Sequence, residues 1–415
     1  FFFLPYFRRG NMTSAYEFLE QRYGPSIRVY GAVAFLVAQI VRLAMILWLL
    51  SLLIQQVTDL SPATAIVLGG LFVGLYTVIG GIDAVIWTDV LQTVVLLLGG
   101  LLCLWVVLEA LPGGLGQIFD QAGKAGKFAL APWEDGAPGE TSWSLSLSEK
   151  TATMMLLIGL TNWLTEYSSN QNTVQRYCAS QSTAEARKGL WVYLFTALPI
   201  WAFYMFLGTA LWVFFQVYPD VQAGAILSGE ARAETLMPYF ITNYLPAGVA
   251  GLVIAAALAA AMSSLDSSIN SVTTVSVVDL YRRHFYPGQD DRHYLKVAWG
   301  IAVAVTGLMI AGALWMNEAD TKTLQDTSTI LVSLLGGGML GLYLLGFFSR
   351  RGDARAAWCG IICTLLFTGW TILTNKGLLP DVLSAPFDLY YTGLIGNLLM
   401  FVVGYLAASY WPADK

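Results

Sequence analysis

The chain has 415 residues, of which 56% are apolar and 12% are charged. Soluble globular domains carry about 25% charged residues, so this composition excludes an ordinary soluble enzyme and an intrinsically disordered chain. The 22 basic residues do not outnumber the 27 acidic residues, which excludes a typical nucleic-acid-binding protein. Long apolar runs instead predict one all-α, polytopic membrane domain over residues 1–415.

The first residues, Phe1–Phe7, are almost all apolar and look like the last turns of a helix. We therefore expect a fold that is truncated at its N-terminus. In the loop that follows, Ser14 precedes Glu17 by three residues, which is the spacing of a capping box. A short helix over residues 15–20, lying at the membrane surface, is the expectation there.

A helix needs about 20 mostly apolar residues to cross the hydrocarbon core of a membrane. Ten stretches meet this requirement: about 29–57, 62–80, 88–111, 149–169, 189–217, 246–281, 294–316, 326–348, 356–374 and 390–410. If Arg8 and Arg9 lie inside and each span crosses once, 15 of the 22 basic residues lie inside and six lie outside. The positive-inside rule supports this orientation in an inner or plasma membrane.

The first span carries a polar pair, Gln39 and Arg42, near its middle. Residues three apart share a helix face, and a guanidinium group can hold a carboxylate through two hydrogen bonds. The functional interpretation is a binding site for a substrate carboxylate. The alternative is a structural role for Arg42, in which it pairs with Glu166 or with backbone carbonyls.

The span 149–169 ends in a polar run that starts after Gly159 and continues to Asn172. A helix break there would expose carbonyl and amide groups to a ligand, as in many transporters. The alternative is a helix end that lines a wet vestibule on the inner side.

The span 246–281 carries a stripe of small and hydroxyl side chains at helical spacing. Its members are Ala260, Ser263, Ser264, Ser267 and Ser271, and Asp266 borders them. Such a hard-oxygen surface suits a sodium ion and offers no soft ligand for a transition metal. The alternative is that the serines bond to carbonyls one turn earlier and hold helices together.

Several stretches resemble the sodium/solute symporter family, which includes sodium–glucose and sodium–sialic acid transporters. The matching stretches are residues 260–271 followed by Asp279-Leu280-Tyr281, residues 170–177, and residues 80–83 followed by 87–90. Residues 13–20 and the Gln39–Arg42 pair look most like the bacterial sialic acid branch.

The resemblance implies a five-plus-five inverted repeat that works by alternating access. The spans would be core helices three to ten plus two further helices, and the first two core helices would be missing. The family's main sodium site carries over to the Ala260 carbonyl and the hydroxyls of Ser263 and Ser264.

Some sialic acid transporters that resemble this chain have a second sodium site, built from a carboxylate before the Val-Gln-Arg motif and two serines. Here the carboxylate position reads Asn172, or Asn170 if the register slips, one serine position reads Asp266, and Ser267 is kept. The chain therefore departs from the pattern of the second sodium site. The arginine at the Arg42 position contacts the substrate carboxylate in the sialic acid branch.

We therefore expect a sodium-coupled symporter, and not an enzyme, that imports a carboxylated sugar such as sialic acid through the membrane. Its partners would be sodium ions, the small substrate and the lipid bilayer, with no nucleic acid. Neutral sugars, amino acids and monocarboxylates stay open as substrates. A transporter-like sensor module and a proton-coupled carrier that uses Asp266 or Glu166 stay open as alternative functions.

Overall fold

A computed structural model describes residues 3–9, 12–58, 60–129, 133–134, 137–138, 141–231, 233–318, 337–349, 352–375 and 377–411. The first part of the chain forms α1 (Leu4–Arg9), α2 (Glu17–Tyr23), α3 (Pro25–Val57), α4 (Pro62–Ala110), α5 (Gly114–Lys124), α6 (Ala152–Ser169) and α7 (Gln171–Ala179). Two short antiparallel strands, β1 (Trp133–Glu134) and β2 (Ala137–Pro138), pair within the loop after α5.

The second part forms α8 (Thr183–Val217), α9 (Val221–Leu227), α10 (Leu236–Tyr244), α11 (Ala247–Val275), α12 (Asp291–Glu318), α14 (Met339–Phe348), α15 (Ala354–Asn375) and α16 (Thr392–Ala407). Single turns of 3₁₀-helix lie at η1 (Ala233–Thr235), η3 (Asp381–Leu383) and η4 (Leu389–Tyr391). A π-helix, η2 (Ser276–Phe285), continues α11 without interruption.

Eight described stretches are long and apolar enough to cross a membrane, and they coincide with eight of the ten predicted spans. The predicted span 149–169 is helical as α6, but it is not among the eight, because its second half is polar. The predicted span 326–348 is described only over α14, and its first part lies outside the described residues. The all-helical membrane fold is therefore confirmed, whereas the inverted repeat stays a prediction.

Helix α4 forms one helical element where the sequence predicted two separate spans. Asp89 bonds to Ser267, and Gly99 lies against Ala256, so this half of α4 runs antiparallel to α11. At 1.5 Å per residue, a straight helix would place Tyr76 about 20 Å, or between three and four turns, away from Asp89 along its axis. Tyr76 instead reaches the same turn of α11 as Asp89 does. The two halves of α4 therefore run in different directions along α11.

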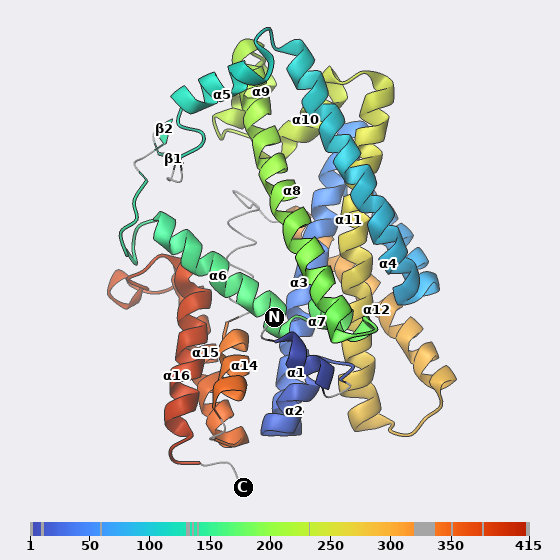
Figure 1. The fold of residues 1–415 in the computed structure, drawn as a ribbon, viewed down its shortest axis with the longest axis vertical. Coiled ribbons are helices and arrows are strands. Elements are labelled where there is room, and N and C mark those ends of the chain that lie inside the picture. The colour runs from blue at the N-terminus through green and yellow to red at the C-terminus, as the bar shows by residue number, and fades with distance from the viewer. Residues whose placement is uncertain are drawn as a thin grey trace.

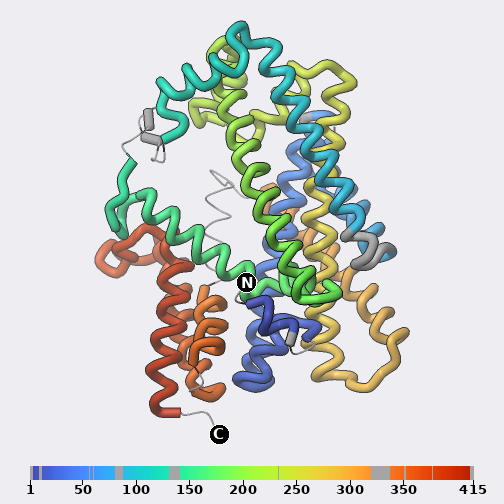
Figure 2. The backbone as a smooth tube through the Cα atoms, in the orientation of Figure 1, coloured from blue at the N-terminus to red at the C-terminus, as the bar shows by residue number. Residues whose placement is uncertain are grey.

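The long helices α3, α4, α8, α11 and α12 form the larger group in Figure 1, and α14, α15 and α16 form a smaller group beside it. Helix α6 contacts α14 and α16 at one end and leads into α7, so it connects the two groups, as the tube in Figure 2 also shows. The apolar core of the larger group centres on α11, where Leu265, Ile269 and Val272 are buried.

A network of ion pairs lies where α2, α3 and η2 meet. The buried Arg28 donates to Asp279 at 2.7 Å and also pairs with Glu20, which in turn pairs with Arg283. The side chain of Arg28 is 8% exposed and that of Asp279 is 0% exposed. Buried charges are stable only when paired, so this network fixes α2 and α3 to η2.

The predicted short helix exists as α2, but the capping box is wrong. Tyr16, and not Ser14, occupies the N-cap position, and no side chain caps the helix. The Glu17 carboxylate accepts from the backbone of Thr13, and the Ser14 hydroxyl accepts from the backbone of Tyr16. The side-chain pattern therefore stabilises the turn before α2 and not its first turn.

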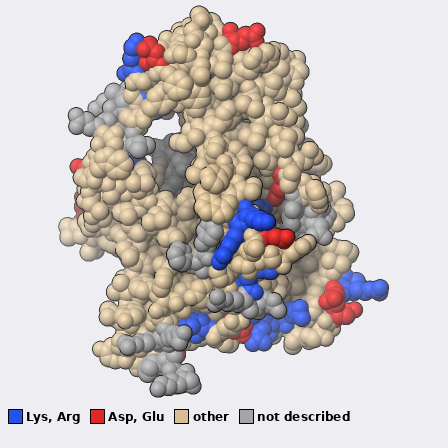
Figure 3. All heavy atoms as spheres, in the orientation of Figure 1, with Lys and Arg blue, Asp and Glu red and all other residues tan. Residues whose placement is uncertain are grey.

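Most Lys and Arg atoms visible in Figure 3 lie in the lower half of the molecule, the half that holds α1 and α2. This distribution agrees with the predicted orientation, in which that end faces the cytoplasm.

Candidate functional site

The predicted sodium-site residues lie in the middle of α11, facing α4. Ala260, Ser263 and Ser264 are half-buried, and the Ser264 hydroxyl donates to the Ala260 carbonyl at 3.4 Å, which is long for a hydrogen bond. The Ser271 hydroxyl donates to the Ser267 carbonyl at 2.9 Å. This bond fits the alternative interpretation, in which the serines bond to carbonyls one turn earlier. The stripe is thus divided between hydroxyls that bond along α11 and hydroxyls that face α4.

The carboxylate that faces this stripe is Asp89 of α4. Its Oδ2 accepts from the Arg176 guanidinium at 2.8 Å and from the Ser267 hydroxyl at 3.4 Å, and the Ser263 hydroxyl lies near this carboxylate. Its Oδ1 is buried and has no hydrogen-bond partner among the described residues. Asp89 therefore brings α4, α7 and α11 together at the predicted ion site.

Sequence reasoning missed Asp89 because it sits at the start of a span, where an acidic residue is ordinary helix capping. What could have indicated a functional role for Asp89 is that it is an acidic residue in an apolar region, close to the Gly-Gly-Ile-Asp motif at residues 80–83. Asn172, the predicted second-site residue, lies in α7, and its Oδ1 is buried without a partner in the described part of the chain. Its role in ion binding stays a prediction.

Asp266 is completely buried next to the stripe. Its Oδ2 accepts from the Tyr76 hydroxyl at 3.0 Å, and its Oδ1 accepts from the Ser267 amide at 2.5 Å. The Tyr76 hydroxyl also lies 3.3 Å from the Met262 carbonyl. Tyr76 thus fixes the turn of α11 on which the candidate ion ligands lie.

Gln39 and Arg42 both lie on α3, but their side chains differ in exposure. Gln39 is 4% exposed, and its Oε1 has no partner among the described residues, whereas Arg42 is exposed. The alternative ion pair between Arg42 and Glu166 is not present within the described residues. Glu166 accepts instead from Asn170 at 2.7 Å and from Thr173 at 2.9 Å.

An arginine near the middle of a membrane span is costly when it faces lipid. The predicted contact of Arg42 with a substrate carboxylate stays a prediction.

The predicted helix break exists, but not at Gly159, through which α6 is continuous. The helix ends at Ser169, and Asn170 has an extended backbone (φ −82°, ψ 121°) before α7 begins. The Asn170 side chain accepts from the Asn172 amide at 2.9 Å and so caps α7.

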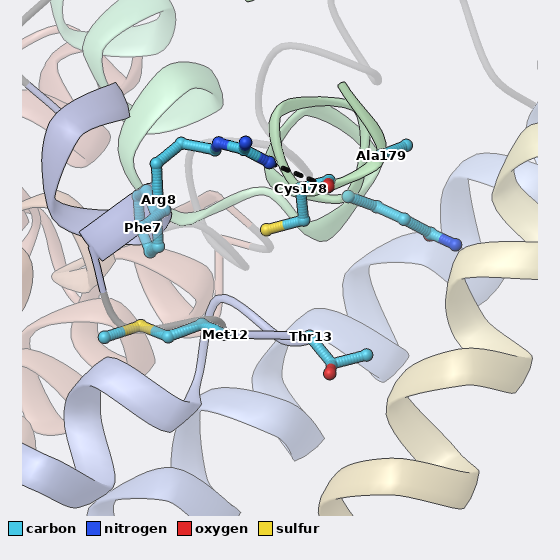
Figure 4. Close-up of a pocket in the computed structure, with 7 residues that line it drawn as sticks. Phe7, Arg8, Met12, Thr13, Cys178 and Ala179 are labelled. Carbon is cyan, nitrogen blue, oxygen red and sulfur yellow. Dashed lines mark hydrogen bonds between the residues drawn. The ribbon is translucent and has the colours of Figure 1, made fainter. Parts of the chain in front are cut away.

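A cavity of about 370 Å³ lies between α1, the segment before α2, and α7. It is lined by Phe7, Arg8, Met12, Thr13, Gln175, Cys178 and Ala179 (Figure 4). The Arg8 guanidinium donates to carbonyls at the end of α7, including that of Cys178 at 3.1 Å and that of Ser180 at 2.7 Å. Arg8 therefore serves as a cap for α7 and is not free to bind a ligand in this cavity.

Comparisons with known proteins agree with this architecture. The model of the sodium:solute symporter family matches residues 1–364. The sodium/sialic acid symporter NanT of Aliivibrio fischeri is 30% identical over 410 residues, which cover 98% of this chain and 76% of that protein. The sodium/sialic acid symporter SiaT of Proteus mirabilis is 30% identical over 418 residues, covering 100% of this chain and 79% of that protein. A solved structure of the substrate-bound, outward-open state of a Na⁺-coupled sialic acid symporter has a TM-score of 0.85 and 28% identity, covering 100% of this chain and 81% of that chain.

Proposed function

Because the chain belongs to the sodium:solute symporter family, we propose that it imports a carboxylated sugar of the sialic acid type together with sodium ions across the inner membrane. The chain is a multi-pass membrane transporter and not an enzyme. The substrate class is supported by the similarity to NanT and SiaT, which extends over nearly the whole chain.

The observation that carries the substrate assignment is the exposure of Arg42 and its lack of a partner among the described residues. It is an exposed guanidinium within a membrane span, and no described residue pairs with it. A carboxylate ligand would supply the missing anion and bind through two parallel hydrogen bonds. Gln39, one turn away with a buried and unpartnered amide oxygen, is the candidate for a second substrate contact.

Sodium is assigned to the α11 stripe. The Ala260 carbonyl and the hydroxyls of Ser263 and Ser264 are the proposed ligands of the main site. Ser267, Asp266 and Asn172 remain the proposed residues of a second site, and the Asp89 carboxylate lies beside Ser267.

These positions suggest how ion binding acts on α7. A cation held at Ser263 attracts the Asp89 carboxylate, which otherwise neutralises Arg176 of α7. Sodium occupancy then weakens the bond between α4 and α7 and changes how firmly α7 is held. The chain would couple ion binding to the helix break at Asn170 in this way.

The test is uptake of labelled sialic acid by the full chain in proteoliposomes, with and without an inward sodium gradient. We expect uptake only with the gradient, loss of uptake in Arg42→Ala, and normal uptake in Arg187→Ala, which removes an exposed arginine of α8. Uptake that persists in sodium-free buffer under a pH gradient would establish the proton-coupled alternative. Transport of neutral sugars, amino acids or monocarboxylates without sialic acid would refute the substrate class.

A further inference from the structure

The helix break at Asn170 leaves α7 as a short segment of nine residues between α6 and α8. In transporters with broken helices, one half of such a helix can move relative to the other. The position of α7 therefore depends on the side chains that hold it and not on continuity with α6.

Three hydrogen bonds join the two sides of this break to the segment before α2. The Gln171 side chain is completely buried; its Oε1 accepts from the Ala15 amide at 2.8 Å, and its Nε2 donates to the Thr13 carbonyl at 3.0 Å. On the other side of the break, the Tyr16 hydroxyl donates to the Ser169 carbonyl at 3.1 Å. We call these three bonds the inner clasp.

The segment 13–16 is itself held from other directions. The Tyr343 hydroxyl of α14 donates to the Ala15 carbonyl at 2.9 Å. The next helix, α2, is fixed by the buried ion pairs of Arg28 with Asp279 and with Glu20. Segment 13–16 is thus an anchored block, to which α7 is attached.

The bonds of the inner clasp differ in kind from the ion pairs of the anchor. A neutral amide or hydroxyl group exchanges a protein hydrogen bond for water at a small net change in free energy, whereas separating a buried ion pair is costly. The cavity of about 370 Å³ between α7 and residues 12–13 also leaves that side of α7 loosely packed. The clasp can therefore open and close while the anchor stays intact.

We propose that Gln171 is a positioning residue that, together with Tyr16, holds α7 against segment 13–16 and keeps the inner side of the transporter closed. Both side chains release α7 when the inner side opens. This inference rests on the proposed function only in requiring that α7 moves during transport.

The native Cys178 reports on this movement because it lies on α7 and lines the cavity next to Met12 and Thr13. Burial raises the pKa of its thiol while α7 is docked, and a thiol reacts with a maleimide through its thiolate form. The experiment measures the rate at which a hydrophilic maleimide labels Cys178 in the purified full chain, with and without sodium. The other cysteines, Cys103, Cys359 and Cys363, are replaced by alanine.

Gln171→Ala removes two bonds of the clasp, and Tyr16→Phe removes the third while the ring stays in place. At roughly fivefold per neutral hydrogen bond, we expect labelling about 25-fold faster in Gln171→Ala and about fivefold faster in Tyr16→Phe. Gln181→Ala, which removes an exposed glutamine just beyond α7, is the matched control and should leave the rate unchanged.

An unchanged labelling rate in both clasp variants, each shown to be folded by size-exclusion chromatography, would overturn the proposal. An equal acceleration in Gln181→Ala would overturn it as well. The labelling rate needs no substrate, so the clasp can be supported even if sialic acid is not transported, and the two failures remain distinguishable.

Discussion

Replacing Arg28 with methionine tests the buried ion-pair network most directly. The substitution keeps much of the side-chain volume but leaves Asp279, which is 0% exposed, without its cation, and it removes one of the two arginines that pair with Glu20. Breaking a buried pair by removing one partner costs about 3–5 kcal/mol. We expect Arg28→Met to lower the free energy of unfolding by that amount, measured by SDS titration in mixed micelles.

Two controls distinguish the cost of leaving a buried charge unpaired from the cost of losing an ion pair in general. The double variant Arg28→Met with Asp279→Leu removes both charges, so it should recover most of the lost stability. Lys124→Met breaks an exposed pair with Asp120, whose side chains are 75% and 58% exposed, and should cost less than about 1 kcal/mol. If Arg28→Met is no more harmful than Lys124→Met, the network does not hold the helix ends together and our reasoning is wrong.

Three further predictions concern the ion site, helix packing and acid stability. Ser264→Ala should raise the sodium concentration for half-maximal uptake because one hydroxyl ligand is lost, and an unchanged value would contradict the site assignment. Gly74→Ala should destabilise the protein by about 1–3 kcal/mol in thermal unfolding, because the new Cβ would lie 2.4 Å from a methyl carbon of Thr306; Gly208→Ala, which meets nothing within 4 Å, should not. Burial raises the pKa of Glu20, but its bonds with Arg28 and Arg283 outweigh this effect and lower the pKa. Stability from Glu20 is therefore complete above its ordinary pKa of about 4.3 and is lost as pH falls through the lowered value, so Glu20→Gln should flatten the acid limb of a stability profile.

The membrane fold was predictable because hydropathy depends on local composition. Eight of the predicted spans appear as apolar helices, and the positions of Ser263, Ser264 and Ser267 along α11 follow from helical periodicity. The reversal within α4 was less predictable, since the helical backbone continues from Pro62 to Ala110 and only its contacts with α11 show the change of direction.

The candidate site was predictable only in part, because its partners are distant in sequence. Asp89 and Arg176 are 87 positions apart, and neither hydropathy nor spacing pairs them. Glu166 is another example: the sequence allowed it to pair with Arg42, but nearby Asn170 and Thr173 satisfy its oxygens. Glu166 bonds to these nearby side chains and not to Arg42, because local hydrogen bonds form without long-range packing.

The π-helix η2 sets the directions in which the side chains of residues 276–285 point. Bonds from residue i to i+5 widen the turn, so each residue of η2 advances around the axis by less than in an α-helix. With this pitch, Asp279 points inward while Arg283 stays exposed at the surface. Deleting one residue between α11 and Asp279 would rotate Asp279 around the helix axis and away from Arg28, which would break this buried ion pair. The number of residues between α11 and Asp279 therefore matters to this ion pair as well as the identity of the residues.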